Sequence, residues 1–112
     1  MRLPAVVWPS PPAWKKRELV RKLRRTLNGR VDAAFLFGSH ARGDATSDSD
    51  VDLMLVHSTR APWPDRFYPF ADLWKDFGAV DLLVYTPAEW KRMQIQRTAF
   101  FSKAKSEWVR VV

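Results

Sequence analysis

The chain has 112 residues, a net charge of +7 and no cysteine. This length favours a single domain over residues 1–112, and the lack of cysteine excludes a disulfide framework and a thiolate metal site. Residues 1–18 contain only a short apolar stretch, interrupted by prolines, so we expect no signal peptide, and no segment reaches the length of a membrane span. We therefore expect a cytoplasmic globular protein whose positive charge attracts nucleotides, nucleic acid or an acidic protein surface.

Helical and strand patterns alternate along the chain. The first helix is predicted from Ser10, with two prolines in its first turn, to the glycine cap at Gly29. A strand that is apolar on both faces follows at residues 31–37 and should be central in its sheet. Further helices are predicted over residues 69–77 and 86–104, and further strands over residues 50–56, 80–85 and 107–112. This order predicts a small sheet with helices packed on one face.

Lysine and arginine are concentrated in residues 14–25, within the first predicted helix. Apolar residues recur there at helical spacing, so the simplest interpretation is the solvated basic face of an amphipathic helix. A patch that binds nucleic acid is the alternative. Six Trp and seven Phe are many for this length, and we expect some of them to form an exposed apolar patch for a partner.

Three aspartates are predicted to converge on one face of the sheet. Side chains alternate along a strand, so Asp50 and Asp52 point to the same face, about 6–7 Å apart. Asp81 begins the strand at residues 80–85, which should pair alongside. Unit charges at that distance repel by roughly 2–3 kcal/mol at an effective dielectric near 20, unless a cation neutralises them. Oxygen ligands without a nearby His or Cys favour Mg²⁺ or Mn²⁺; the alternative is the solvated face of an amphipathic strand.

Two familiar ion-binding motifs are excluded. An EF-hand loop starting at Asp48 would require Gly and Glu where the chain has Leu53 and Thr59. A Walker A loop starting at Gly38 would require Lys where the chain has Asp44. Neither a calcium loop nor a P-loop is therefore present.

Gly38 and Ser39 come directly after the strand predicted at residues 31–37. Glycine lets a phosphate approach the backbone, and the Ser39 hydroxyl and nearby N–H groups can donate to its oxygens. Taken alone, Ser39 would be an ordinary helix cap. Ten residues before Asp50, the pair predicts an anion cradle that complements a metal site.

The arrangement of Gly38-Ser39, ten intervening residues, Asp50-Val51-Asp52 and a later Asp81 resembles the signature of the DNA polymerase beta superfamily of nucleotidyltransferases. The wider string GSHARGDATSDSDVDL is similar to the minimal nucleotidyltransferases, which are often paired with HEPN-domain proteins as toxin–antitoxin modules. The similarity covers residues 31–84 and, more loosely, YTPAEW and the last strand. It implies a two-layer α+β fold with a mixed sheet.

The same resemblance implies roles for individual residues. Gly38 and Ser39 would hold the β- and γ-phosphates of ATP. Asp50, Asp52 and Asp81 would bind two Mg²⁺ ions, with Mn²⁺ as an alternative, and Asp81 would also help to deprotonate the acceptor hydroxyl.

Arg42 matches an arginine that is common after the Gly-Ser pair in this superfamily. It would reach the triphosphate, or it would form a salt bridge to Asp44 or Asp48, and the sequence does not decide between these two roles.

The leading hypothesis is transfer of AMP from ATP to a hydroxyl, with release of pyrophosphate. By resemblance to the antitoxins, the acceptor would be a tyrosine of a HEPN-type toxin. Three alternatives stay open: a non-catalytic antitoxin that blocks its partner by contact, a small-molecule adenylyltransferase of the aminoglycoside type, and a nucleic-acid binder that uses the first helix.

Overall fold

The computed structural model describes residues 14–112, so the predicted helix start at Ser10 lies outside the described residues. The helices are α1 (Lys16–Leu27), α2 (Gly38–Arg42), α3 (Asp72–Phe77), α4 (Pro87–Gln96) and α5 (Ala99–Glu107), with two 3-10 turns, η1 (Trp63–Asp65) and η2 (Tyr68–Phe70). The strands are β1 (Ala33–Phe37), β2 (Val51–Val56), β3 (Val80–Tyr85) and β4 (Val109–Arg110). All four strands lie within the segments predicted for them.

The four strands form one mixed sheet in the order β3-β2-β1-β4. β1 pairs antiparallel with β2 and with β4, whereas β2 and β3 are parallel. The parallel pair requires a long crossover, and the chain uses η1, η2 and α3 for it. β1 is an inner strand, as its two apolar faces predict, and β3 is an edge. The α+β class and the mixed sheet are thus confirmed.

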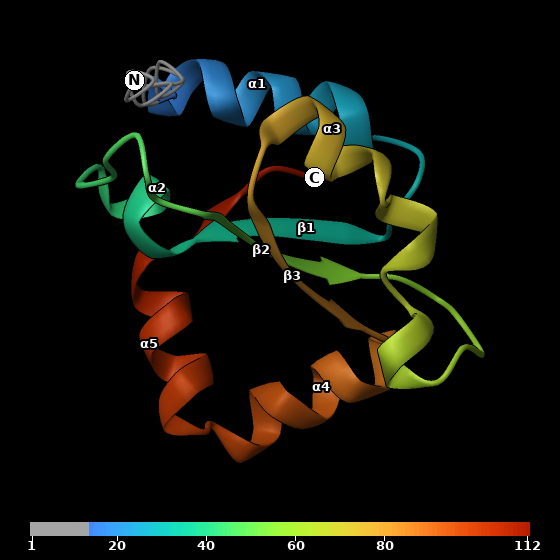
Figure 1. The fold of residues 1–112 in the computed structure, drawn as a ribbon. Helices are drawn as coiled ribbons and strands as arrows, with labels where there is room; N and C mark the ends of the chain where they lie inside the picture. The colour runs from blue at the N-terminus through green and yellow to red at the C-terminus, as the bar shows by residue number, and fades with distance from the viewer. Residues whose placement is uncertain (1–13) are drawn as a thin grey trace, which may run out of the picture.

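Helices cover both faces of this sheet, α1 and α3 on one side and α4 and α5 on the other (Figure 1). The first layer buries Leu19, Leu23 and Leu27 of α1 against the sheet. The second layer packs Trp90 and Ala104 onto the opposite face of the same strands. The prediction of helices on one face is therefore corrected, because β1 and β2 present apolar side chains on both faces and both must be removed from water.

The segment predicted as one helix over residues 86–104 forms two. Its start is confirmed, because Thr86 and Glu89 exchange the reciprocal hydrogen bonds of a capping box. Arg97 then adopts a left-handed conformation, with φ of 51°, and ends α4. Thr98 caps α5 by accepting the N–H of Phe101. The break turns the chain, so that α5 runs back along the sheet toward α2 (Figure 1).

Trp14 and Lys15 fall within the predicted N-terminal helix but are not helical, and α1 begins at Lys16. Within residues 14–112, no helix has the length and apolar character that crossing a lipid bilayer requires.

Candidate active site

The predicted site residues gather at one end of the sheet, where β1 ends and where β2 and β3 begin. The last residue of β1, Phe37, pairs with Asp52, and Asp52 pairs with Asp81 across the parallel ladder. Residues paired in this way point to the same face, and adjacent strands lie about 4.8 Å apart. The structure therefore brings Asp52 and Asp81 side by side, and Asp50 directly precedes β2.

Gly38 places the backbone of α2 against Asp52. Its φ is +72°, and a Cβ atom added there would lie 2.0 Å from Oδ2 of Asp52. Any other residue would therefore collide with the carboxylate and would also be strained in its backbone. Ser39 follows at the start of the same helix, half-buried.

Asp52 is the half-buried carboxylate of the group. Burial raises the pKa of Asp52 to about 6, and the charges of Asp81 and Asp50 add to the rise. Electrostatic interactions with His40 and Arg42 lower the pKa of Asp52 but do not cancel the rise. The ionised form of Asp52 is thus destabilised in the site, and a bound cation would stabilise it.

A divalent ion suits the chemistry of these donors. In the part of the chain that the structure describes, no three His, Cys, Asp or Glu side chains are arranged to hold an ion by themselves. Mg²⁺ is commonly bound by one or two carboxylates, while waters and substrate phosphates complete its shell. The carboxylates of Asp52 and Asp81 on adjacent strands fit that mode, in which the substrate supplies part of the coordination.

Sequence reasoning missed Glu107, the last residue of α5. Its Oε1 accepts the N–H of Gly38 at 3.3 Å, and both of its oxygens lie 3.2 Å from Nη1 of Arg42. Burial would raise the pKa of Glu107, but the hydrogen bonds from Arg42 and Gly38 lower it below its ordinary value. One signal was present: Glu107 is the only acidic residue after Glu89.

Arg42 is held by two carboxylates. Its Nε donates to Oδ2 of Asp44 at 3.2 Å, and its Nη1 donates to Glu107. Of the two salt bridges considered from the sequence, the one to Asp44 is formed.

The two histidines lie outside this group. His40 is buried, and its Nε2 lies 3.2 Å from the carbonyl oxygen of Ser49, which ties α2 to the loop before β2. His57 packs edge-on against Phe70, with 5.2 Å between the ring centres.

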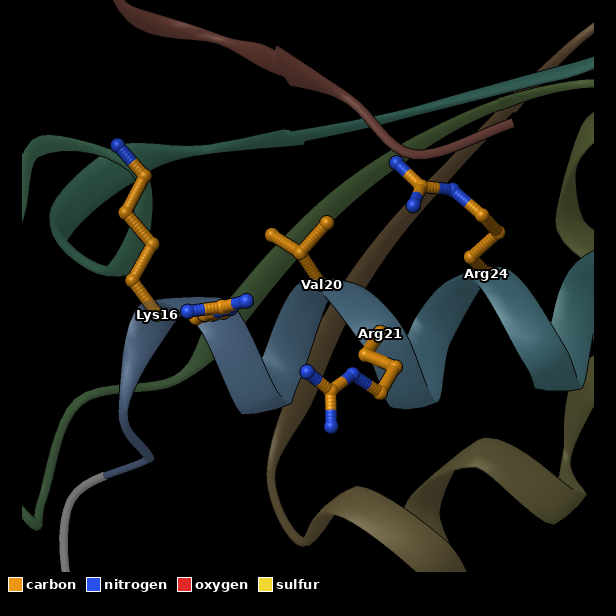
Figure 2. A pocket seen from close by; sticks show the side chains of 5 residues that line it. Lys16, Val20, Arg21 and Arg24 are labelled. Atoms are coloured by element: carbon orange, nitrogen blue, oxygen red, sulfur yellow. The ribbon is translucent and has the colours of Figure 1, made fainter.

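A concave region lies on α1, and none of the aspartates lines it. An open groove of about 570 Å³ is lined by Val20 and by four cationic side chains, those of Lys16, Arg17, Arg21 and Arg24. Figure 2 shows Lys16, Val20 and Arg24 projecting from one side of the helix. Among the described residues none of these four cations forms an ion pair, and residues 1–13 contain no Asp or Glu. The groove is therefore a site of uncompensated positive charge.

Residues 16–76 match the family described as the nucleotidyltransferase domain. The match covers more than half of the chain and includes every predicted site residue except Asp81. The chain belongs to the nucleotidyltransferase domain family. Glu107 also lies beyond the residues that match.

Two proteins are similar to parts of this nucleotidyltransferase domain. A protein of Methanocaldococcus jannaschii named "Putative protein adenylyltransferase" is 45% identical over 40 residues, which are 36% of this chain and 40% of that protein. The chain thus matches less than half the length of that relative. A solved structure titled as a "putative nucleotidyltransferase" from Sulfolobus solfataricus is 27% identical, with a TM-score of 0.43, and the match covers 70% of each chain.

The contact between Gly38 and Asp52 can be tested with a matched pair of variants. Gly38→Ala and Gly43→Ala both place alanine at positive φ, but a Cβ at Gly43 meets nothing within 4 Å. We expect Gly43→Ala to lose about 1–2 kcal/mol of unfolding free energy in urea, from backbone strain. Gly38→Ala should lose more, because its Cβ must also displace the Asp52 side chain. Only Gly38→Ala should also move the side-chain carboxyl ¹³C resonance of Asp52. An unmoved resonance in that variant would contradict the close approach.

The raised pKa of Asp52 has a defined effect on stability. Because the folded state holds this proton more tightly than the unfolded state, stability falls as the pH rises from about 4 through about 6. Asp52→Asn removes the effect, so we expect it to be more stable than wild type at pH 7.5 by about 1 kcal/mol, with allowance for solvent screening. The difference should shrink towards pH 4 in thermal unfolding. Asp48→Asn, an exposed loop carboxylate, controls for net charge; parallel curves for wild type and Asp52→Asn would refute the prediction.

Proposed function

We propose that this nucleotidyltransferase transfers AMP from ATP to a hydroxyl group of a partner protein. The observation that carries the proposal is the pairing of Asp52 with Asp81 on adjacent strands, directly beside the backbone of Gly38. The carboxylates and the glycine-containing turn then lie next to each other. A triphosphate bound there would have its metal ion held by the carboxylates and its oxygens bound by the N–H groups of the turn. The absence of cysteine fits the cytoplasmic location that the proposal includes.

Each group has a role in the proposed reaction. The N–H groups at Gly38 and Ser39, with Arg42, bind the β- and γ-phosphates. The acceptor oxygen forms a bond to the α-phosphorus while the bond from that phosphorus to the pyrophosphate oxygen breaks. Asp81, exposed on the edge strand, accepts the proton of the acceptor hydroxyl.

Asp50, Asp52 and Asp81 would hold two Mg²⁺ ions, or Mn²⁺. When bound, such ions supply positive charge to the phosphate oxygens and lower the pKa of the attacking hydroxyl. The protein's own share is positioning and charge compensation, which is most of what phosphoryl transfer requires.

A protein acceptor is supported by the surface beside β3. Four aromatic side chains in the crossover between β2 and β3 are well exposed, namely Trp63, Phe67, Tyr68 and Trp74. Large exposed aromatics are typical of interface cores. The Methanocaldococcus relative carries the name of a protein adenylyltransferase, and the resemblance to minimal nucleotidyltransferases suggests a tyrosine of a HEPN-type toxin as the acceptor. An aminoglycoside acceptor is disfavoured, because a polycation is repelled by a chain of charge +7.

The catalytic proposal predicts which carboxylates matter. The assay contains Mg²⁺, ATP labelled at the α-phosphate and a HEPN-domain protein as the candidate acceptor, and wild type should transfer label to that acceptor. Asp50→Asn and Asp52→Asn should lower the rate at least about 100-fold, because each removes a charge that faces the phosphates. Asp48→Asn, in the same loop, should keep the wild-type rate. Equal rates for all three variants would refute the assignment.

The same experiment separates catalysis from binding. If the Asp50/Asp52 double variant transfers no label but still neutralises the partner, the protein acts as a non-catalytic antitoxin that blocks its partner by contact.

A second candidate function, binding of a nucleic-acid backbone, is favoured by the groove on α1. Its cations have no carboxylate partners among the described residues, and phosphates would supply them. Residues four apart on a helix are spaced by about 6 Å, so Arg17 and Arg21 could contact successive charges along a strand.

This second function predicts a steep salt dependence. Binding of a 20-base-pair duplex should weaken with salt, and a Lys16→Ala/Arg17→Ala/Arg21→Ala variant should reduce the slope of log K against log salt by about 3. Removal of three exposed cations on the α4 and α5 side, Lys91, Arg92 and Lys105, provides the control of equal charge. Equal slopes for the two triple variants would eliminate a site on α1.

A further inference from the structure

Glu107 places a negative charge on the groups that the proposed reaction assigns to phosphates. Three donors are directed at its carboxylate: the N–H of Gly38 at 3.3 Å, Nη1 of Arg42 at 3.2 Å and, more distantly, Nζ of Lys103 at 3.7 Å. The side chain of Glu107 is only 11% exposed, whereas that of Asp44, the other carboxylate on Arg42, is 63% exposed. Glu107 is therefore the more firmly held of the two.

The N–H of Gly38 carries a single proton, so it cannot make a full hydrogen bond to Glu107 and to a phosphate oxygen at the same time. Arg42 already donates to two carboxylates, and Oε1 of Glu107 accepts both from Nη1 of Arg42 and from the N–H of Gly38. Carboxylate and phosphate oxygens accept from the same donors with similar geometry. The two anions consequently exclude each other at this position.

The backbone that carries Glu107 is anchored. The next residue, Trp108, packs its ring 4.5 Å from that of Phe35 on β1 and 5.4 Å from that of Trp90. Phe101, two helical turns before Trp108, is buried against the rings of Trp90 and Trp108. The end of α5 is thus fixed on the core, and only rotation of the Glu107 side chain is needed to release Gly38 and Arg42.

We propose that Glu107 is an internal competitor of the triphosphate: it occupies Gly38 and Arg42 when the site is empty and is displaced when the β- and γ-phosphates bind. This inference rests on the proposed function, which assigns those phosphates to Gly38 and Arg42. Glu107 thereby sets the affinity for ATP. AMP, whose one phosphate belongs beside the aspartates, does not displace it.

The test measures nucleotide affinity by calorimetry in the presence of Mg²⁺. Glu107→Gln keeps the size of the side chain and weakens its hold on Arg42, so we expect ATP to bind about tenfold more tightly than to wild type. Asp44→Asn removes one charge from the same guanidinium but leaves Gly38 untouched, and it should tighten ATP binding at most about threefold. The affinity for AMP should change by less than about twofold in both variants.

A second measurement needs no variant. In the wild-type protein, titration with ATP should shift the amide resonance of Gly38 and the carboxyl ¹³C resonance of Glu107 together, whereas AMP should leave the Glu107 resonance in place. If Glu107→Gln fails to fold, this titration still decides the matter.

The outcomes distinguish failure of the competition by Glu107 from failure of the proposed function. If ATP binds to wild type and depends on Asp52, but Glu107→Gln is no tighter than Asp44→Asn, competition by Glu107 is wrong and the proposed function is unaffected. If ATP tightening is matched by equal AMP tightening, Glu107 acts only through net charge and the inference is again wrong. If ATP does not bind to wild type or to either variant, the proposed function fails and the inference fails with it.

Discussion

Gly38 and Asp52 touch where β1 gives way to α2, and a residue with a side chain does not fit between them. This contact requires both the positive φ of the glycine and the register that sets Phe37 opposite Asp52. A slip of one residue in β2 would move Asp52 to the face covered by α1 and α3. Backbone conformation and strand register together therefore determine whether carboxylate and turn can serve one ligand.

The double-sided core explains why that register is stable. On one face α1 and α3 bury leucines against the sheet, and on the other the ring of Trp90 stacks on those of Phe35 and Trp108. A register shift would exchange these two sets of side chains and expose both. The acids lie at the strand ends, where Asp50 and Asp81 reach solvent and only Asp52 is half-buried. The free energy of the core thus offsets the repulsion among the carboxylates.

Local pattern predicted a large part of the fold. The four strands and the helix start at Thr86 follow from side-chain alternation and helix-capping chemistry, which act over a few residues, and the aspartate strands were expected to pair. The break at Arg97 was missed because a left-handed arginine has no sequence signature, unlike a glycine. Glu107 was missed for a related reason: it reaches Gly38 across 69 positions of sequence, and only the turn made by that break brings it there. Long-range contacts of single charged residues carry no periodicity from which to predict them.

Because α5 begins directly after the break at Arg97, its length determines where Glu107 lies. Each residue of a helix advances its side chains by about 100° around the axis. One residue inserted or deleted between Thr98 and Glu107 would swing the terminal carboxylate away from α2 and turn Phe101 or Trp108 off the core. Residues on the exposed surface of α5 can therefore change in type. The number of residues between the cap at Thr98 and the carboxylate of Glu107 must stay constant.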